Sequence, residues 1–319
     1  MSSWQYLAAV LWAFTYVNAK SFFPYLLNEI LDEKPIPEHC GRSRYHGDHS
    51  NRWPTLGVRK RIVGGLLSKY GEWPWLVSMQ LNRNRNGNGS FYEHMCGGTL
   101  IDSQWVISAA HCFEKIWVDF LTDDPSAWMV RIGEHNMFKN EGTHVDVKPI
   151  KIFFPPARDP PRTYNLDVAL IKLERPVRLS QHVNVACLPR TDDYVPPGSV
   201  CVTAGWGHTV ESGNVSAIVR HVDVPILSNE LCNQLYSKIK NYKLRIYDDM
   251  LCAGLETGGK DACQYDSGGP MVCYDHEDQQ WQLTAVVSTG YGCARAGFPG
   301  IYTRVSKFVN WIEDTVAKN

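Results

Sequence analysis

The sequence has almost no excess of charge of either sign, because its 319 residues hold 32 Lys and Arg against 33 Asp and Glu. A nucleic-acid-binding protein typically shows a strong basic excess, so we exclude nucleic acid as a partner. The chain also lacks the low hydrophobicity of a disordered protein, since 44% of its residues are hydrophobic. Its length therefore predicts one large or two small folded domains with a substantial core.

Long apolar runs are missing except at the N-terminus. Residues 6–17 form an apolar run of signal-peptide length, and Val-Asn-Ala at positions 17–19 supplies a small-residue end, although no basic residue precedes Lys20. An uncleaved membrane anchor would need about 20 apolar residues, and the polar residues at 18 and 20 interrupt this run. We interpret residues 1–19 as a signal peptide and expect a secreted, extracellular protein that is not attached to a membrane.

Two further features fit an oxidising, extracellular compartment. The ten cysteines are even in number, as a disulfide framework requires, although the count alone also fits metal sites. Asn88-Gly89-Ser90 and Asn214-Val215-Ser216 match the acceptor tripeptide for N-glycosylation. We therefore expect disulfide bonds, and glycans at Asn88 and Asn214.

The pattern of the chain changes at Ile62. Residues 20–61 are rich in Pro, His, Arg and Gly without a periodic apolar pattern, which predicts an extended propeptide that ends in Arg59-Lys60-Arg61. From Ile62 onward, short apolar runs alternate with turn residues, a spacing typical of all-β barrels or sandwiches. A helix is expected at the C-terminal end, where Ser306 can cap a run with apolar side chains on one face, and a shorter one at Ser228.

Three short segments hold the groups that nucleophilic hydrolysis needs, which are a hydroxyl, a base, an acid that orients the base, and donors for the oxyanion. They are Ser108-Ala109-Ala110-His111-Cys112, Asn165-Leu166-Asp167-Val168-Ala169-Leu170 and Asp266-Ser267-Gly268-Gly269-Pro270. Taken singly, His111 could be a zinc ligand, Asp167 a strand-end cap and Ser267 a turn residue. Taken together in the order His, Asp, Ser, and preceded by Arg61-Ile62-Val63-Gly64-Gly65, they resemble the zymogens of trypsin-like serine proteases with the chymotrypsin fold.

The resemblance covers residues 62–319 and implies an all-β fold of two six-stranded antiparallel β-barrels with a C-terminal helix. It implies that His111 acts as general base and then acid, that Asp167 orients it, and that Ser267 attacks the scissile carbonyl. The oxyanion donors would be the backbone N–H groups of Tyr265 and Ser267. Such a serine endopeptidase needs no cofactor and works as a monomer on protein or peptide substrates, with protease inhibitors and an activating protease as its other partners.

The same resemblance implies the pairing of all ten cysteines. Four bridges would lie within the catalytic domain, and the fifth would tie the propeptide to it as a light chain. The pairs are Cys96 with Cys112, Cys201 with Cys273, Cys232 with Cys252, Cys263 with Cys293, and Cys40 with Cys187.

Activation and specificity are implied in the same way. Cleavage after Arg61 would free the amino group of Ile62, which would bury itself against Asp266, because a buried ammonium and a buried carboxylate are tolerated only as a pair. Asp261, six residues before the nucleophile, would lie at the floor of the substrate pocket and attract Arg or Lys. Gly290 and Gly300 would form the walls of this pocket and Ser288 would back Asp167. Alternatively, Asp261 is an exposed loop acid.

Several positions depart from the family's pattern. Tyr265 replaces the glycine of the oxyanion hole, where a side chain restricts the backbone and crowds the leaving-group side. Thr289 replaces a tryptophan that walls neighbouring subsites, so selectivity for the preceding substrate residues should loosen. Residues 114–128 form a longer loop with Asp119, Asp123 and Asp124, which we interpret as either a selectivity lid over the cleft or an insertion without effect.

A calcium site is a further possibility, because an oxygen-rich loop resembles that of the family. Its candidate ligands are Glu134, Asn136 and Glu141, but His144 stands where an acidic ligand is expected, and calcium prefers several carboxylate oxygens.

Two classes of function follow from these residues. The first is a secreted endopeptidase that cleaves after Arg or Lys and is activated at Arg61-Ile62. The alternative is a catalytically weak or inactive homologue that serves as a binding or decoy module, since Tyr265 could close the oxyanion hole. A purely structural disulfide-rich protein would have no reason to combine an activation site, a triad and a pocket acid.

Overall fold

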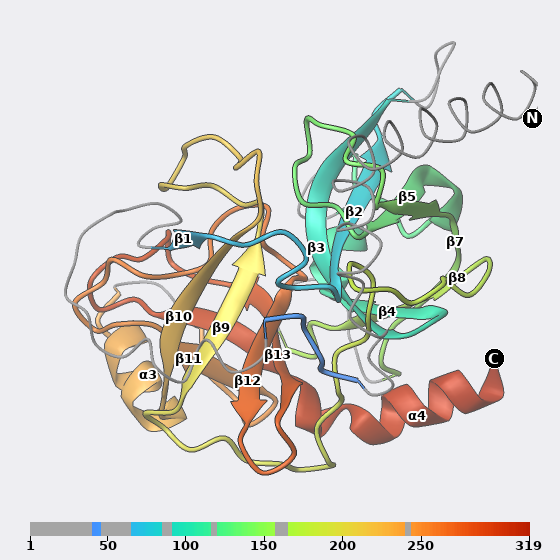
Figure 1. Ribbon diagram of the computed structural model, residues 1–319. Helices are drawn as coiled ribbons and strands as arrows, with labels where there is room; N and C mark the ends of the chain where they lie inside the picture. The colour runs from blue at the N-terminus through green and yellow to red at the C-terminus, as the bar shows by residue number, and fades with distance from the viewer. Residues whose placement is uncertain (1–39, 46–64, 85–90, 116–119, 157–164, 240–243) are drawn as a thin grey trace, which may run out of the picture. The chain divides into compact units, whose positions relative to one another are not determined.

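The structure is a computed structural model that describes residues 40–45, 65–84, 91–115, 120–156, 165–239 and 244–319. The expected signal peptide, nearly all of the propeptide, the Arg61-Ile62 bond, Asn88 and Asp119 lie outside these residues. Two antiparallel sheets make up most of the described part (Figure 1). No helix within the described residues is long and apolar enough to cross a bilayer.

The first sheet has the strand order β6-β5-β2-β3-β4-β8-β7. Only Lys148 separates β6 from β7, so one stretch of chain, residues 145–153, pairs with β5 at its start and with β8 at its end and closes the sheet into a barrel. Its strands are β2 (Leu76–Asn82), β3 (Tyr92–Asp102), β4 (Trp105–Ser108), β5 (Trp128–Ile132), β6 (Val145–Val147), β7 (Pro149–Phe153) and β8 (Ala169–Leu173).

The second sheet has the order β1-β10-β11-β14-β13-β12-β9, and β9 also pairs with β10, which closes the second barrel. Its strands are β1 (Leu66–Leu67), β9 (Val200–Gly205), β10 (Arg220–Leu227), β11 (Met250–Ala253), β12 (Pro270–Asp275), β13 (Gln280–Thr289) and β14 (Gly300–Arg304). The expected pair of barrels is confirmed. Each sheet has seven strands instead of six, because one strand is interrupted at Lys148 and the two-residue β1 joins the second sheet.

Alternation of apolar and polar side chains explains why these segments form strands. Along β5 every second residue is buried, and β10 shows a similar alternation, as expected where one face of a sheet meets a core. Strands β2 and β8 are almost entirely buried. One face of each strand lies toward the barrel interior, and neighbouring elements cover the other face. Trp75, Trp128 and Trp206 are fully buried and fill much of this core.

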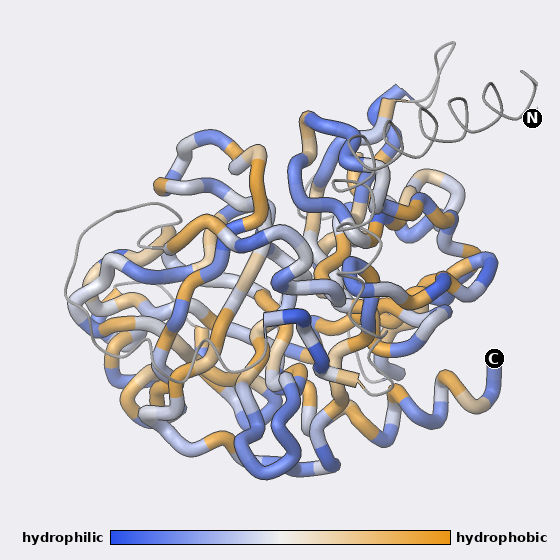
Figure 2. The backbone as a smooth tube through the Cα atoms, viewed as in Figure 1, coloured by the Kyte–Doolittle hydropathy of each residue, from blue (hydrophilic) through white to orange (hydrophobic). Residues whose placement is uncertain are grey.

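Two α-helices complete the described part, with loops that are mostly hydrophilic between the strands (Figure 2). Ser228 caps α3 (Asn229–Tyr236) by accepting the Leu231 N–H at 3.1 Å, as the sequence predicts. The last helix, α4 (Val309–Lys318), shows alternating apolar and polar positions in Figure 2 and buries Val309 and Ile312.

The expected cap of the last helix is wrong. Ser306 lies inside a short 3-10 helix, Val305–Lys307, and its hydroxyl donates to the Asp193 carbonyl at 2.8 Å. The N-cap position of α4 is held by Phe308, which makes no side-chain cap. The 3-10 turn comes between the sequence signal and the helix, and a turn of this kind is common at helix ends.

Residues 40–45 are joined to the two-barrel part of the chain through the Cys40–Cys187 disulfide. The Gly41 N–H donates to Val185 O at 2.7 Å, and the Trp281 N–H donates to Gly41 O at 2.9 Å. Gly41 has a φ of 66°, and a Cβ there would lie 2.7 Å from Trp281 N and 2.9 Å from Cys187 Sγ. Only glycine fits this approach of two backbones.

Substituting Gly41→Ala should therefore lower the thermal stability. The alanine costs about 1–2 kcal/mol for its left-handed backbone and about 1–3 kcal/mol for the forced contacts. Gly142→Ala is the matched control, because Gly142 has a φ of 78° and a Cβ added there would meet nothing within 4 Å. Calorimetry should show a larger loss in Tm for Gly41→Ala, at about 2–4 °C per kcal/mol. Equal losses would contradict the described docking of this segment.

Candidate active site

His111 and Asp167 come together because of the pairing of two neighbouring strands. β4 and β8 are antiparallel with Ser108 opposite Ala169, so His111, just after β4, and Asp167, just before β8, leave the sheet at the same end. His111 lies in a 3-10 helix, Ala110–Phe113, that follows β4. The register alone therefore places a base beside a carboxylate.

His111 and Ser288 are hydrogen-bonded to the Asp167 carboxylate. Its Oδ2 lies 2.7 Å from His111 Nδ1 and accepts the Ser288 hydroxyl at 2.5 Å, while its Oδ1 accepts the His111 backbone N–H at 2.9 Å. The Thr303 hydroxyl donates to the Asp167 carbonyl at 2.8 Å. The carboxylate is fully buried and accepts a hydrogen bond from Nδ1. This bond places the proton of a neutral His111 on Nδ1 and leaves Nε2 as the basic nitrogen.

Ser267 comes from the second barrel, in the turn before β12. It lines one pocket of about 240 Å³ together with His111, and its carbonyl accepts the Gly97 N–H at 2.7 Å. Gly268 follows with a φ of 82°, and a Cβ there would collide with the Ser108 hydroxyl and with Gly97 O. The glycine lets the turn that carries Ser267 lie directly against the first barrel.

Asp261 lies at the inner end of the same pocket. Its side chain is 3% exposed, and its Oδ2 accepts the Ala294 N–H at 3.0 Å. Burial raises the pKa of this carboxyl to about 7. The other reading of Asp261, as an exposed loop acid, does not hold for this structure. A buried acid that lines an open pocket is suited to receive a cationic side chain.

Glycines leave the pocket open in front of Asp261. Gly290 and Gly300 both line it, and a Cβ on Gly300 would collide with Asp261 Oδ1. Tyr302, which the sequence analysis missed, lies beside this carboxylate with its hydroxyl 3.5 Å from Asp261 Oδ1. No local pattern marks Tyr302, because it reads as an ordinary buried position of a strand.

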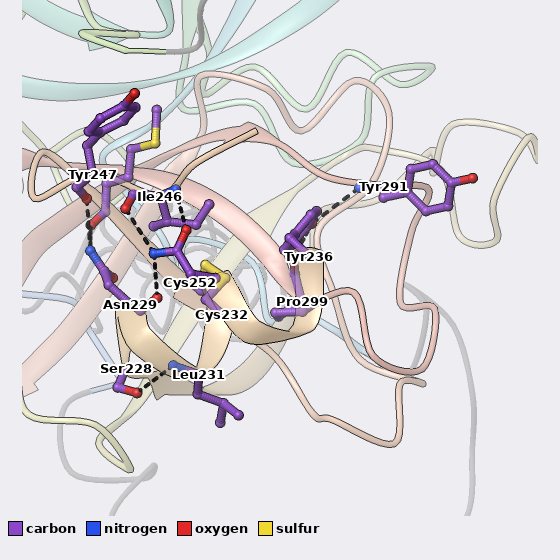
Figure 3. Close-up of a disulfide and its surroundings, with 12 residues drawn as sticks. Ser228, Asn229, Leu231, Cys232, Tyr236, Ile246, Tyr247, Cys252, Tyr291 and Pro299 are labelled. Atoms are coloured by element: carbon purple, nitrogen blue, oxygen red, sulfur yellow. Dashed lines mark hydrogen bonds between the residues drawn. A yellow bond between two sulfur atoms is a disulfide. The ribbon is translucent and has the colours of Figure 1, made fainter. Parts of the chain in front are cut away.

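The pocket wall is supported from behind by α3 (Figure 3). The Tyr236 hydroxyl donates to Pro299 O at 2.7 Å and accepts the Tyr291 N–H at 3.3 Å, so it joins the two wall segments that carry Gly290 and Gly300. The Cys232–Cys252 disulfide ties α3 to β11. The sequence did not indicate this role of Tyr236, which is visible only once the helix is placed.

Tyr265 keeps the backbone conformation that a glycine would adopt. Its φ is 73°, and its ring packs on His208 with the centroids 5.1 Å apart. Within the described residues, neither its N–H nor that of Ser267 donates to a backbone carbonyl, so both donors remain available for an oxyanion. The substitution by tyrosine therefore leaves the backbone in the conformation that glycine would adopt, and the ring lies against His208.

Asp266 is buried next to Ser267, with 3% of its surface exposed. Its Oδ1 accepts the Gly207 N–H at 2.8 Å and its Oδ2 accepts the Cys263 N–H at 3.0 Å. Burial raises its pKa to about 6. Among the described residues it forms no ion pair with Lys, Arg or His, and its charge is balanced only by hydrogen bonds.

The structure joins all ten cysteines in five disulfides, and they are the pairs that the resemblance implied. These are Cys40–Cys187, Cys96–Cys112, Cys201–Cys273, Cys232–Cys252 and Cys263–Cys293. The last one frames the substrate pocket, and Cys96–Cys112 fixes the turn that carries His111. Asn214, one of the two glycosylation candidates, is exposed.

The residues suggested for calcium have hydrogen-bond partners within the chain. Glu134 Oε2 accepts Arg131 Nη1 at 3.0 Å, and the same guanidinium holds Asp146 at 2.7 and 2.8 Å. Glu141 Oε2 accepts the Asn136 N–H at 3.0 Å. In the described part of the chain no group of three or more His, Cys, Asp or Glu side chains is arranged to hold a metal. An arginine thus supplies the positive charge in this loop.

Part of the long loop after His111 is packed against the first barrel. Leu121 is buried, and Trp128 Nε1 donates to Thr122 O at 2.8 Å. Asp124 caps a short 3-10 helix by accepting the Ser126 N–H at 3.0 Å, while Asp123 is exposed. Nothing in the described residues places these acids over the pocket, so the lid remains a hypothesis.

Two closed antiparallel barrels that share one pocket between a His–Asp pair and a serine define a trypsin-like serine protease. The sequence model of the trypsin family matches residues 62–312. Cationic trypsin-3 of Rattus norvegicus is 40% identical over 260 residues, which are 81% of this chain and 91% of the rat protein. Serine proteinase stubble of Drosophila melanogaster is 37% identical over 272 residues, 82% of this chain, but this chain spans only 32% of that protein. The chain belongs to the trypsin family of serine endopeptidases.

Proposed function

We propose that this chain is a secreted zymogen of an endopeptidase that hydrolyses peptide bonds after Arg or Lys. The observation that carries the proposal is Asp261, a buried carboxylate in the pocket that also holds Ser267 and His111. An Arg or Lys side chain in this pocket would place its cation against Asp261 and the following carbonyl at Ser267. The enzyme acts without a metal or organic cofactor and as a monomer, and protein inhibitors that mimic a substrate are further partners.

The reaction uses groups that the chain itself supplies. Ser267 Oγ attacks the scissile carbonyl while His111 Nε2 takes its proton, and the cation that forms on His111 is stabilised by Asp167. The N–H groups of Tyr265 and Ser267 stabilise the oxyanion. His111 then gives its proton to the leaving amine, and a water molecule repeats the sequence to release the acyl group.

Subsites beside the pocket follow from two substitutions. Thr289 lines the pocket at the position where the family's pattern has a tryptophan. Because threonine is smaller, we propose broad selectivity for the substrate residues that precede the Arg or Lys. On the leaving-group side the Tyr265 ring, packed on His208, narrows the range of substrates and inhibitors.

Activation is proposed to occur by cleavage between Arg61 and Ile62. The new ammonium group of Ile62 would pair with Asp266, whose carboxylate accepts the backbone N–H groups of Gly207 and Cys263 within the described residues. Such a pair would hold the turn that carries Ser267 and the oxyanion donors. The leader would remain attached afterwards, since Cys40–Cys187 and the hydrogen bonds of Gly41 hold it to the catalytic part.

Binding of a cation in the pocket should depend on pH. Because the pKa of Asp261 is raised to about 7, the carboxyl is protonated below that pH and must lose its proton when an amidinium binds. Benzamidine affinity should be constant above pH 7 and fall toward tenfold per pH unit below it. Calorimetry between pH 5 and 9 would show this dependence. The His111→Ala variant is used, so that the imidazole that lines the same pocket does not contribute. A flat profile would contradict a buried, titrating Asp261.

The proposed activation can be tested by labelling with a fluorophosphonate, which forms a bond from Ser267 Oγ to phosphorus and releases fluoride. The chain cleaved at Arg61 should label stoichiometrically, and the uncleaved Arg61→Gln chain should label far more slowly. The cleaved protein should keep its mass on a non-reducing gel and separate into two chains on a reducing one. A cleaved chain that stays unlabelled would favour the binding or decoy homologue.

A further inference from the structure

We propose that His94 is a positioning residue for hydrolysis, which holds the Tyr265 backbone in the conformation that directs its N–H at the oxyanion. The inference rests on the proposed function, because it concerns the same oxyanion hole. It assigns a role to a buried side chain that no part of the mechanism above uses.

The position of His94 results from an irregularity in β3. Gln80 of β2 pairs with His94, whereas Met79 pairs with Cys96, so Met95 is an extra residue in β3 without a partner across the pair. A bulge of this kind bends a strand and re-aims its side chains. His94 is 7% exposed and lies edge-on to the buried Trp206, with ring centroids 5.5 Å apart.

The two ring nitrogens of His94 have different partners. Nε2 lies 3.0 Å from Tyr265 O, and because a carbonyl only accepts, Nε2 carries the proton. Nδ1 then accepts the Ser78 hydroxyl at 2.8 Å, and Ser78 Oγ accepts from Gln80 Nε2 at 3.3 Å. Burial lowers the pKa of His94 to about 4, so the ring stays neutral and in this tautomer at physiological pH.

The peptide group between Tyr265 and Asp266 is held at both ends. Its carbonyl accepts from His94, and its N–H donates to Cys263 O at 3.0 Å. Both bonds act against relaxation of Tyr265, whose φ of 73° is unfavourable for any residue except glycine. Without the His94 donor, Tyr265 can return to negative φ, and this rotation turns its own N–H away from the oxyanion.

Ser267, the other source of an oxyanion donor, is held independently. Its carbonyl accepts the Gly97 N–H, and the next residue, Gly268, donates to Val287 O at 2.8 Å. The loss of the His94 bond should therefore cost one oxyanion donor and leave the nucleophile in place. Because glycine adopts positive φ freely, the dependence on His94 should disappear when residue 265 is glycine.

The test combines His94→Phe, His94→Gln and Tyr265→Gly in the cleaved enzyme. Phenylalanine fills the space of the ring without a donor, whereas the amide of glutamine can donate to Tyr265 O and accept from Ser78. Two inhibitors distinguish an effect on the oxyanion hole from an effect on the pocket of Asp261. A peptide arginal forms a hemiacetal with Ser267 Oγ, whose new oxygen occupies the hole, and benzamidine contacts only the pocket of Asp261.

We expect His94→Phe to lower kcat and arginal affinity about 10²-fold with unchanged KM and benzamidine affinity, and His94→Gln to restore most of the loss. In the Tyr265→Gly background, His94→Phe should have little effect. Equal losses for both inhibitors, or the same loss in both backgrounds, would overturn the inference in favour of a purely structural His94. An inactive parent enzyme that binds neither inhibitor would instead refute the proposed function.

Discussion

Replacing Ser267 by alanine should reduce kcat by about 10⁴–10⁶ while leaving benzamidine affinity unchanged. The large factor is expected because Ser267 Oγ forms the bond to the substrate, and the remaining groups can only polarise the carbonyl. Benzamidine affinity should persist, because its amidinium pairs with Asp261 and the substitution leaves that carboxylate in place. Hydrolysis of an Arg peptide and benzamidine calorimetry on the same preparation give both quantities.

Ser237→Ala is the matched control for this experiment, because Ser237 is exposed at the end of α3 and, among the described residues, its hydroxyl donates to the nearby Gln234 O. It should leave kcat and Tm unchanged. If Ser267→Ala retained a tenth or more of the wild-type kcat, the nucleophile would have to be another group.

The second large effect is expected for Asp261→Asn. Removing the carboxylate leaves the guanidinium of a bound Arg substrate buried and unpaired, a loss of about 3–5 kcal/mol, or roughly 10²–10⁴ in kcat/KM. Hydrolysis of a matched Leu peptide should be nearly unchanged, because its side chain does not need the charge. The ratio of the two kcat/KM values therefore isolates the contribution of Asp261.

Stability provides the control for folding in this variant. Burial raises the pKa of Asp261 from 3.8 to about 7, so the stability of the empty pocket falls as the pH rises between these values, and the whole loss is present at pH 8. The Asp261→Asn variant, which is neutral at this position, should thus be at least as stable as the wild type at pH 8. A lower Tm together with equal losses for Arg and Leu peptides would show that the substitution damages the fold and not the specificity.

The parts of the site that depend on local pattern could be predicted from the sequence. His111, Asp167 and Ser267 are each marked by their neighbours, and their order along the chain fixes the arrangement once the fold is known. The spacing of Asp261 from Ser267 and the even number of cysteines can likewise be recognised directly in the sequence. These features could be predicted because each is visible in the sequence without knowledge of contacts between distant segments.

The parts that depend on packing between distant segments could not be predicted. The φ of Tyr265 is maintained by contacts with His94 and Cys263, and neither is visible in the local sequence. Tyr236 supports the pocket wall from a helix more than 50 residues before it in the chain. Such contacts are set by tertiary structure, which a linear pattern does not contain.

The calcium site stays a prediction, and its candidate ligands have partners within the chain. Glu134, Asn136 and Glu141 have the right atoms, but Arg131 lies beside Glu134 and supplies the charge that a cation would bring. The arginine is three residues before Glu134 and could have been noticed. Its direction could not, because the pairing of β5 with β6 determines that it meets Asp146.

Hydrolysis of paired Arg and Leu peptides by the chain cleaved at Arg61, with the uncleaved chain alongside, tests the central claim most directly. The account predicts turnover of the Arg peptide that appears only after cleavage and exceeds that of the Leu peptide by at least about 10². Equal turnover of both peptides would contradict the assignment of Asp261. No turnover by a chain whose Ile62 terminus is confirmed would contradict the proposed endopeptidase itself.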